Sequence, residues 1–323
     1  MNHSPIVRAV DVGYGHVKFT DGRDPESNEI RTDSIPSQSP AALVQVQKTG
    51  RGESSFSGGV VMRSRDTFRV PVGDRTYEVG RDVHLATVGT NVTEVLDREF
   101  ALSDAYAARL FGAINYMLPS LPDHEIDILV LGLPLTTYQQ RRADLENRFV
   151  GTHVIDDRGT TVRIDACCVY PQPLGSYAAY IAGTQGLSEA PLALIIDIGY
   201  NTIDWFVCHG LIASDVQSSA VERGMGEVLR AMADDIIAKH HLNSAQAQIV
   251  RTLDRSLVDN KPFKQHGEVI DLGPHFAAGE VVIEEAAQII VNRIGSGGDL
   301  DVIILTGGGA TLFAPVIRNS YLR

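Results

Sequence analysis

Two short stretches of the sequence repeat the same chemistry-bearing residues in the same order. The first, AVDVGYGHVK, spans Ala9 to Lys18, and the second, IIDIGYNTID, spans Ile195 to Asp204. At an offset of 186 (197 − 11), the Asp, Gly and Tyr of the two stretches coincide, with β-branched residues around them. Each stretch predicts a strand, a tight turn and a second strand, with a carboxylate at the end of the first strand. Backbone N–H groups in such a turn can bind phosphate oxygens, and a carboxylate can act on a magnesium ion.

A third glycine turn, Gly307–Gly309, follows the apolar run Val302–Leu305 and precedes a predicted helix. Glycine lets the backbone approach a ligand closely, and a helix N-terminus adds partial positive charge. The three turns together fit a nucleotide whose polyphosphate lies between the two hairpins and whose nucleoside rests on the third turn. We therefore predict a duplicated fold that faces one shared ligand.

The elements that must position these turns can be read from periodicity and capping residues. A buried strand is predicted at Ile126–Leu133, and a helix beginning at Ser103 or Asp104 should run to Leu118. The pattern also predicts a hairpin at Thr67–Val79 that turns at Gly73 and Asp74, a loop at Asp21–Asn28, and short strands near His153–Ile155 and Thr161–Ile164. Further helices are predicted at 138–149 behind a capping box at Thr136 and Thr137, at 227–240 behind a glycine turn, and at 280–294. Gln172 opens an Ala-rich helix between the two halves of the repeat, near the expected phosphates.

Composition limits the class of protein and its partners. The 323 residues are 44% hydrophobic and 21% charged, which is typical of a soluble protein with two domains. The net charge of −12 disfavours direct contact with nucleic acid. The N-terminus lacks a secretory signal pattern, and no run of 18 apolar residues occurs. We expect a cytoplasmic protein that does not contact the membrane, with its three cysteines reduced in the core.

The motifs together resemble those of the actin, Hsp70 and sugar-kinase superfamily. Asp11–Gly15 with Lys18 looks like the first phosphate loop, and Gln172–Tyr177 like the first connecting helix. Asp197–Asp204 looks like the second phosphate loop, and Leu305–Ala310 like the adenosine loop. Within the superfamily, the sequence is most similar to bacterial plasmid-segregation actins of the ParM/StbA type, and particularly to the actin-like member of the plasmid-borne PRTRC cluster.

This resemblance implies an α/β, actin-like fold, which is a duplicated ribonuclease H-like fold with a nucleotide cleft between two domains. Domain I would span residues 1–168 with a small inserted subdomain at about 30–100, and domain II residues 169–323 with an inserted subdomain at about 222–280. The family continues past its adenosine loop with a further strand and helix, whereas this sequence ends 14 residues (323 − 309) after Gly309. We expect either a shortened chain or a missing closing element.

The resemblance also implies roles for individual residues. Asp11 and Asp197 would hold Mg²⁺ through water, and Gln172 would orient the attacking water, so these three would be the catalytic residues. The remaining positions would bind the nucleotide, ATP or GTP. They are Gly13, Tyr14, Gly15, His16 and Lys18 in the first loop, Gly199, Tyr200, Asn201 and Thr202 in the second, Gly224, Gly226 and Glu227 along the ribose and base, and Gly307, Gly308 and Gly309 under the adenosine.

The implied function is a slow ATP hydrolase that forms nucleotide-dependent filaments and moves plasmid DNA through a DNA-binding adaptor. Phosphoryl transfer needs positioning, charge neutralisation and a placed nucleophile, and a neutral Gln172 is too weak a base for fast turnover. A small-molecule kinase of the same superfamily is the main alternative, with Asp204 as its best candidate base. A nucleotide-dependent switch that does not polymerise is a further alternative.

Overall fold

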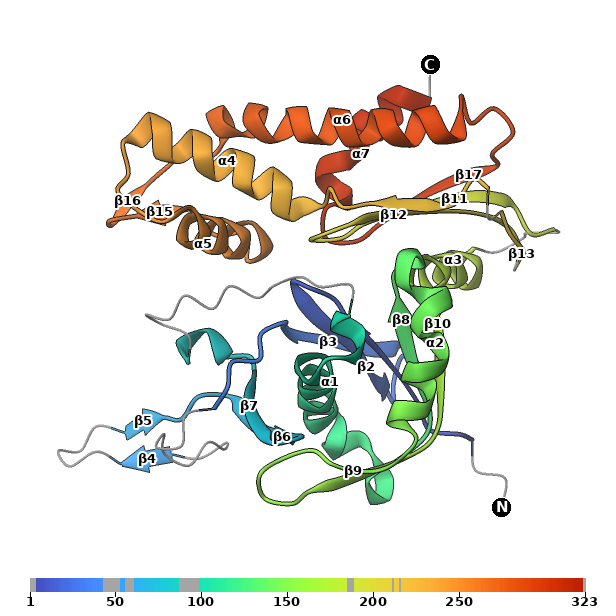
Figure 1. Cartoon of the computed structure of the whole chain (residues 1–323), viewed down its shortest axis with the longest axis vertical. Helices are drawn as coiled ribbons and strands as arrows, with labels where there is room; N and C mark the ends of the chain where they lie inside the picture. The colour runs from blue at the N-terminus through green and yellow to red at the C-terminus, as the bar shows by residue number, and fades with distance from the viewer. Residues whose placement is uncertain are drawn as a thin grey trace. The chain divides into compact units, whose positions relative to one another are not determined.

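The computed structural model describes residues 4–42, 53–55, 61–86, 99–184, 189–210, 212–214 and 216–321. The chain divides into two compact units, Met1–Gln172 and Pro173–Arg323, each with its own hydrophobic core (Figure 1). The expected inserted subdomain at about 30–100 falls partly on residues 43–52, 56–60 and 87–98, which lie outside the described ranges. None of the helices within those ranges is both long and apolar enough to cross a membrane.

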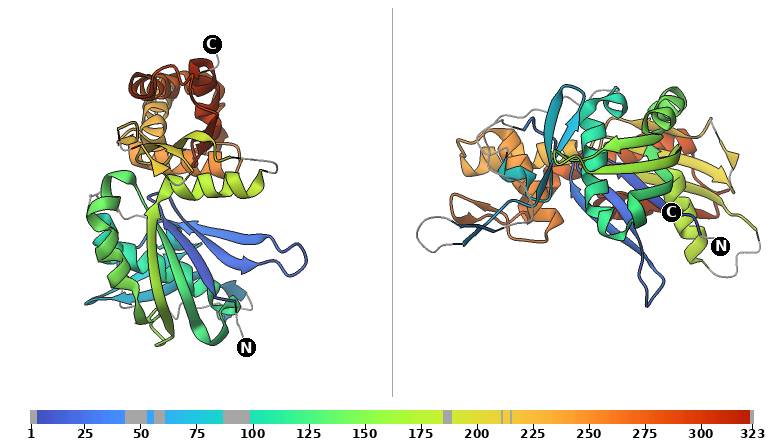
Figure 2. Two further views of the ribbon diagram at one scale, coloured as in Figure 1. Left: turned by 90° about the vertical axis from the view of Figure 1, so that its right-hand side faces the viewer. Right: turned by 90° about the horizontal axis from the view of Figure 1, so that it is seen from below.

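The first unit is built on a six-stranded sheet with the strand order β3-β2-β1-β8-β10-β9. Its strands are β1 (Val7–Val12), β2 (His16–Arg23), β3 (Ile30–Pro36), β8 (Glu125–Leu133), β9 (Gly151–Val154) and β10 (Thr161–Pro171). β1, β8 and β10 are parallel neighbours, so their carboxyl ends meet at one edge of the sheet. The β2–β3 hairpin extends past the other strands of this sheet (blue in Figure 2, left).

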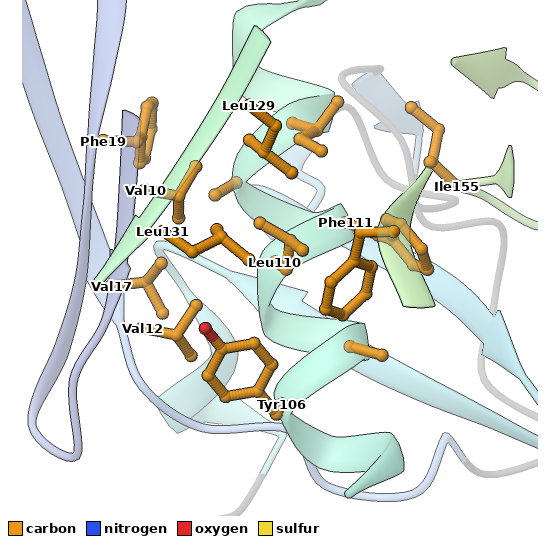
Figure 3. Packing of buried hydrophobic residues seen from close by; sticks show 14 of the residues in the cluster. Val10, Val12, Val17, Phe19, Tyr106, Leu110, Phe111, Leu129, Leu131 and Ile155 are labelled. Carbon is orange, nitrogen blue, oxygen red and sulfur yellow. The ribbon is translucent and has the colours of Figure 1, made fainter. Parts of the chain in front are cut away.

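Two helices, α1 (Asp104–Met117) and α2 (Leu135–Phe149), cover one face of this sheet. They meet through the Tyr106, Phe111 and Phe149 rings, and α1 is buried along nearly its whole length. Its apolar side chains pack against those of β1 and β8 (Figure 3). The Ser103 hydroxyl caps α1 by accepting the Tyr106 N–H, which confirms the predicted start of the helix.

Smaller strands complete the first unit. They are β4 (Glu53–Ser55), β5 (Val61–Arg63), β6 (Thr67–Val72) and β7 (Arg75–Gly80), which pair as the hairpins β4–β5 and β6–β7. The β6–β7 hairpin turns at Gly73 and Asp74 as predicted, and it packs against α1.

The second unit is built on the strand order β13-β12-β11-β17, with β14 also pairing β12. Its elements are α3 (Gln172–Gly183), β11 (Leu192–Ile198), β12 (Ile203–His209), β13 (Ile212–Ala213), β14 (Ser219–Val221), α4 (Met225–His240), α5 (Gln246–Val258), β15 (Lys264–Gln265), β16 (Glu268–Val269), α6 (Phe276–Ile294), β17 (Val302–Thr306) and α7 (Ala310–Tyr321). β11 is antiparallel to β12 and parallel to β17. The helices α4, α6 and α7 share the core with these strands, so the sheet edge near the glycine turns rests on a packed layer.

Three predicted details of secondary structure were wrong. The helix predicted to begin behind Thr136 and Thr137 starts earlier, because α2 already begins at Leu135 after Pro134, and the Thr137 hydroxyl donates to the Pro134 carbonyl. β2 continues to Arg23, where a loop was predicted from Asp21, because its pairing with β3 continues past that point. The short strands predicted near His153–Ile155 and Thr161–Ile164 occur as β9 and β10, but β10 continues for 11 residues to Pro171, because it pairs with β8 over most of its length.

Candidate functional site

The first predicted catalytic pair meets at the carboxyl edge of the first unit's sheet. Val10 and Val12 point into the core, so alternation along β1 places the Asp11 side chain on the opposite face. There the Gln172 Nε2 donates a hydrogen bond of 2.6 Å to Asp11 Oδ1. Lys18 is the direct antiparallel partner of Asp11. Two residues 161 positions apart are thus in contact because β10 delivers Gln172 alongside β8.

The electrostatics of Asp11 favour a bound cation. Desolvation by the surrounding protein raises the pKa of its carboxyl above the ordinary value, and the Gln172 hydrogen bond and the Lys18 charge offset this rise in part. A carboxylate partly shielded from water is stabilised when a positive ion is brought to it.

Gly132 makes room for this pair. A Cβ at this position of β8 would lie 2.9 Å from Cγ of Gln172 and 3.7 Å from Oδ1 of Asp11. Any larger residue would push the Gln172 side chain away from the carboxylate, so the glycine belongs to the site although it contributes no functional group.

The two repeated turns have the same internal geometry. In the second unit, Gly199 N–H donates to the Thr202 carbonyl at 2.9 Å, and a Cβ on Gly199 would lie 3.1 Å from that oxygen. In the first unit, a Cβ on Gly13 would lie 2.9 Å from the carbonyl of His16, the residue equivalent to Thr202. The offset of 186 read from the sequence is therefore a structural repeat.

The two turns also differ in ways that bear on chemistry. Asp197 pairs with Asp204 at the register position where Asp11 pairs with Lys18, so a cation in one copy is replaced by a carboxylate in the other. Asp204 is only 3% exposed and accepts the Thr202 hydroxyl at 2.8 Å. It helps to hold the second turn.

The turn preceding α4 is hydrogen-bonded to the second of the two repeated turns. Backbone N–H groups of Gly224, Met225 and Gly226 donate to the carbonyls of Asn201, Gly199 and Tyr200 in turn, at 3.1, 2.9 and 2.7 Å. A Cβ on Gly224 would lie 2.5 Å from the carbonyl oxygen of Tyr200. Only glycine allows these two stretches of backbone to lie so close.

The third glycine turn lies beside Asp197. Register between β11 and β17 places Thr306 next to Asp197, and a Cβ on Gly307 would lie 2.5 Å from Asp197 Oδ1. Gly309 N–H donates to the Ile198 carbonyl at 3.1 Å, whereas Gly308 is exposed. The Ser176 hydroxyl near the start of α3 donates to Thr306 at 3.0 Å, so that helix is tied to the same edge.

The sequence-predicted residues therefore gather in two sets. In the first unit Asp11, Gly13, Tyr14, Gly15, His16, Lys18 and Gln172 lie at one turn and its flanking strand ends. In the second unit Asp197, Gly199, Tyr200, Asn201, Thr202, Gly224, Gly226, Glu227, Gly307, Gly308 and Gly309 belong to three adjoining turns. The roles assigned to them from the sequence stay predictions.

The donor set suits Mg²⁺ and a polyphosphate. Within the described ranges, no group of three or more His, Cys, Asp and Glu side chains is placed to hold a metal. Mg²⁺ normally keeps several waters and takes one or two carboxylates plus substrate phosphates. Asp11 in the first unit and Asp197 in the second each have a half-buried carboxylate beside a glycine turn, so each unit by itself offers a donor of this kind.

Sequence reasoning missed several residues that shape the site. Gly132 was not singled out, and Thr306 was included only within the Leu305–Ala310 motif without a role of its own. Ser37 and Arg109, which contact the first turn or its support, were also missed. Arg109 lies inside an otherwise apolar helical run, and such an isolated charge in a buried stretch is a usable signal. The other three could be identified only from the sheet register.

Comparison with known proteins identifies the family. Residues 9–175 match the model of the N-terminal domain of actin-like proteins, and residues 195–319 match the C-terminal model of an MreB-like archaeal actin homologue. Among curated protein sequences, no significant match to the chain was found.

Solved structures agree on the fold. The archaeal actin homologue Ta0583 in complex with ADP is 16% identical with a TM-score of 0.64, covering 98% of this chain and 91% of that one. A 15-stranded ParM filament from Clostridium botulinum is 16% identical with a TM-score of 0.69, covering 98% and 93%. The AlfA filament from a Bacillus subtilis plasmid is 14% identical with a TM-score of 0.57, covering 97% and 88%. At such identities the solved structures establish only the two-domain α/β actin-like fold. The family model that matches residues 9–175 covers more than half of the sequence, so the chain belongs to the family of actin-like proteins.

Proposed function

We propose that this protein is a cytoplasmic actin-like ATPase that binds ATP with Mg²⁺, hydrolyses it slowly and forms nucleotide-dependent filaments for plasmid DNA segregation. The observation that carries the proposal is the Asp11–Gln172 pair at the first turn, in a chain that repeats the same turn at Asp197. In this pair, a carboxylate that could bind Mg²⁺ lies beside an amide that could orient a water molecule, and the adjoining turn has backbone N–H groups that could bind phosphate.

The geometry of Gln172 supports its amide oxygen as the atom that would orient the attacking water. A carboxylate only accepts hydrogen bonds, so the Asp11 contact requires the amide nitrogen of Gln172 to face Asp11. The Oε1 atom is then the group that can accept an O–H from the attacking water. Because an amide oxygen cannot take up a proton at neutral pH, it orients the water without serving as a base, and slow hydrolysis follows. Bound Mg²⁺ would supply charge neutralisation at the phosphates.

Filament formation and plasmid segregation are supported by the family and by the ParM and AlfA relatives, whose structures are those of filaments. The net charge of −12 favours indirect contact with plasmid DNA through a DNA-binding adaptor, because an acidic surface repels phosphate. Self-association in the filament is the other partnership that we propose.

The rival proposal of a small-molecule kinase finds less support. It needs a carboxylate that can reach a substrate hydroxyl, and Asp204 is 3% exposed and accepts the Thr202 hydroxyl. A carboxylate held in this way is poorly placed to take a proton from a bound substrate. Only experiment can distinguish a filament-forming protein from a nucleotide-binding switch that does not polymerise.

The test is light scattering of the purified protein after addition of Mg·ATP, with Mg·ADP as the control. A rise above a critical concentration, followed by decay as phosphate is released, is the expected result. Gln172→Ala should bind nucleotide and polymerise but release phosphate roughly 10- to 100-fold more slowly, because the water loses its orienting group. Flat scattering with intact nucleotide binding would refute the filament, and phosphate release at the wild-type rate would refute the role of Gln172.

A further inference from the structure

Ser37 forms two hydrogen bonds to the first of the repeated turns, residues 13–16, which we propose binds phosphate. The Ser37 backbone N–H donates to the carbonyl of Gly15 at 2.9 Å, and its hydroxyl donates to the carbonyl of Gly13 at 2.5 Å. Ser37 directly follows β3 and is only 2% exposed, so these bonds are shielded from water. One residue therefore fixes two carbonyl groups of the turn.

Fixing these carbonyls also fixes the direction of two N–H groups. The described peptide bonds are trans, and in a trans peptide the C=O and the following N–H point in opposite directions. The Gly13 carbonyl shares its peptide with the Tyr14 N–H, and the Gly15 carbonyl shares its peptide with the His16 N–H. Both N–H groups are therefore directed away from Ser37, and both belong to the predicted phosphate-binding set.

A buried arginine supports the serine. Arg109 on α1 is 1% exposed; its Nη1 donates to the Ser37 hydroxyl at 3.0 Å and its Nε to the Ser39 hydroxyl at 3.1 Å. A hydroxyl that accepts from a cation is polarised and becomes a stronger donor, here to the Gly13 carbonyl. The Arg109 guanidinium also lies 4.8 Å from the centre of the Phe100 ring, which packs against the Tyr14 ring at 5.1 Å. The same cation thus supports the turn through two side chains.

We propose that Arg109 and Ser37 are positioning residues that orient the peptide groups of the first turn toward the nucleotide phosphates. This proposal rests on the proposed nucleotide-binding function. The pair acts through the backbone of residues 13–16, without contacting the ligand. Preorganised N–H groups bind an anion without a reorganisation cost at the moment of binding, so loss of the pair should weaken phosphate recognition in particular.

The test uses Ser37→Ala with Ser39→Ala as a matched control. Both changes remove one hydroxyl that accepts from Arg109, but only the Ser37 hydroxyl reaches the turn. Dissociation constants for Mg·ATP, Mg·ADP and AMP are measured by competition against a fluorescent ATP analogue, together with melting temperatures. Ser37→Ala should weaken Mg·ATP and Mg·ADP about five- to tenfold more than Ser39→Ala does, the effect of one well-placed hydrogen bond. AMP, which lacks the β- and γ-phosphates, should be affected less.

The outcomes separate the two levels of the proposal. A wild-type protein that binds no nucleotide would overturn the proposed function and this inference together. If the wild-type protein binds nucleotide, two results would overturn the positioning role alone. One is equal dissociation constants for Ser37→Ala and Ser39→Ala, and the other is an equal loss of affinity for AMP and Mg·ATP in Ser37→Ala. If Ser37→Ala does not fold, Arg109→Lys decides, since lysine keeps the charge but lacks the planar fork that presents Nη1 to Ser37 and Nε to Ser39 in a fixed geometry. It should shift the same constants, and unchanged affinity would refute the proposal.

Discussion

The replacement of Gly307 by alanine tests the packing of the third glycine turn against Asp197. Gly307 has φ +87°, and an added Cβ would lie 2.5 Å from Asp197 Oδ1 and 2.7 Å from the carbonyl carbon of Ile198. A left-handed conformation costs an alanine about 1–2 kcal/mol, and overpacking against rigid backbone adds about 1–3 kcal/mol. The sum is about 2–5 kcal/mol. In a unit of 151 residues (323 − 172), where 1 kcal/mol shifts Tm by about 2–4 °C, it corresponds to a loss of roughly 4–20 °C.

Gly308→Ala is the matched control. An added Cβ there would meet nothing within 4 Å, and Gly308 is not among the glycines with positive φ. Its free energy of unfolding should change by less than about 0.5 kcal/mol. Thermal unfolding followed by circular dichroism compares the two variants, and the nucleotide affinity of Gly307→Ala is then compared with that of the wild type at a temperature where both are folded. A Gly307→Ala protein that melts within about 2 °C of Gly308→Ala would refute the packing argument. Gly307→Ala should also lose affinity for nucleotide, because the displaced turn pushes on the Asp197 carboxylate.

Three further predictions follow from the titratable groups. Asp11→Asn should leave the folded protein as stable as wild type or more stable at pH 7, because a carboxyl with a raised pKa costs stability once it ionises. The same variant should lose Mg²⁺-dependent nucleotide binding, which calorimetry with and without Mg²⁺ measures. Burial raises the pKa of the Cys167 thiol to about 12 and that of Cys208 to about 11, so both should resist Ellman's reagent at pH 8 in the native protein and react after denaturation; rapid native labelling of either would contradict their burial. Hydrogen bonds from Lys239 and His275 lower the pKa of Asp235. The contribution of Asp235 to stability is therefore present above its unfolded pKa of about 4 and is lost as the pH falls through the lower folded pKa. Asp235→Asn should lower Tm at pH 7, and a Tm difference that persists undiminished at pH 2 would contradict this explanation.

The strength of the local predictions varied with the kind of information they used. The α1 start at Ser103 and the β6–β7 turn at Gly73 were predicted correctly, because a capping hydroxyl and a hairpin turn depend on neighbouring residues. The helix start predicted behind Thr136 and Thr137 was wrong, because Pro134 already provides the helix start and the capping-box pattern is a weaker signal than the strand end before it. The full length of β10 was missed, because pairing with β8 decides it.

The sequence by itself determined the repeated turns, the glycine positions and the family. These features are encoded in residues close together in the chain, and a residue type such as glycine carries its conformational consequence with it. The offset of 186 between Asp11 and Asp197 is visible in the order of the amino acids alone, and the backbone geometry of both turns agrees with it.

Only the tertiary structure decided how the site is supported. The contact of Gln172 with Asp11, the space left by Gly132, and the bonds that join Arg109 and Ser37 to the first turn link residues up to 161 positions apart. Such contacts depend on strand order and on the register of β8 with β10, which follow from the burial of the whole core rather than from any local pattern. The residues that would touch the proposed ligand were therefore visible in the sequence. Of the residues that hold them in place, only Arg109, an isolated charge in a buried helix, left a signal there.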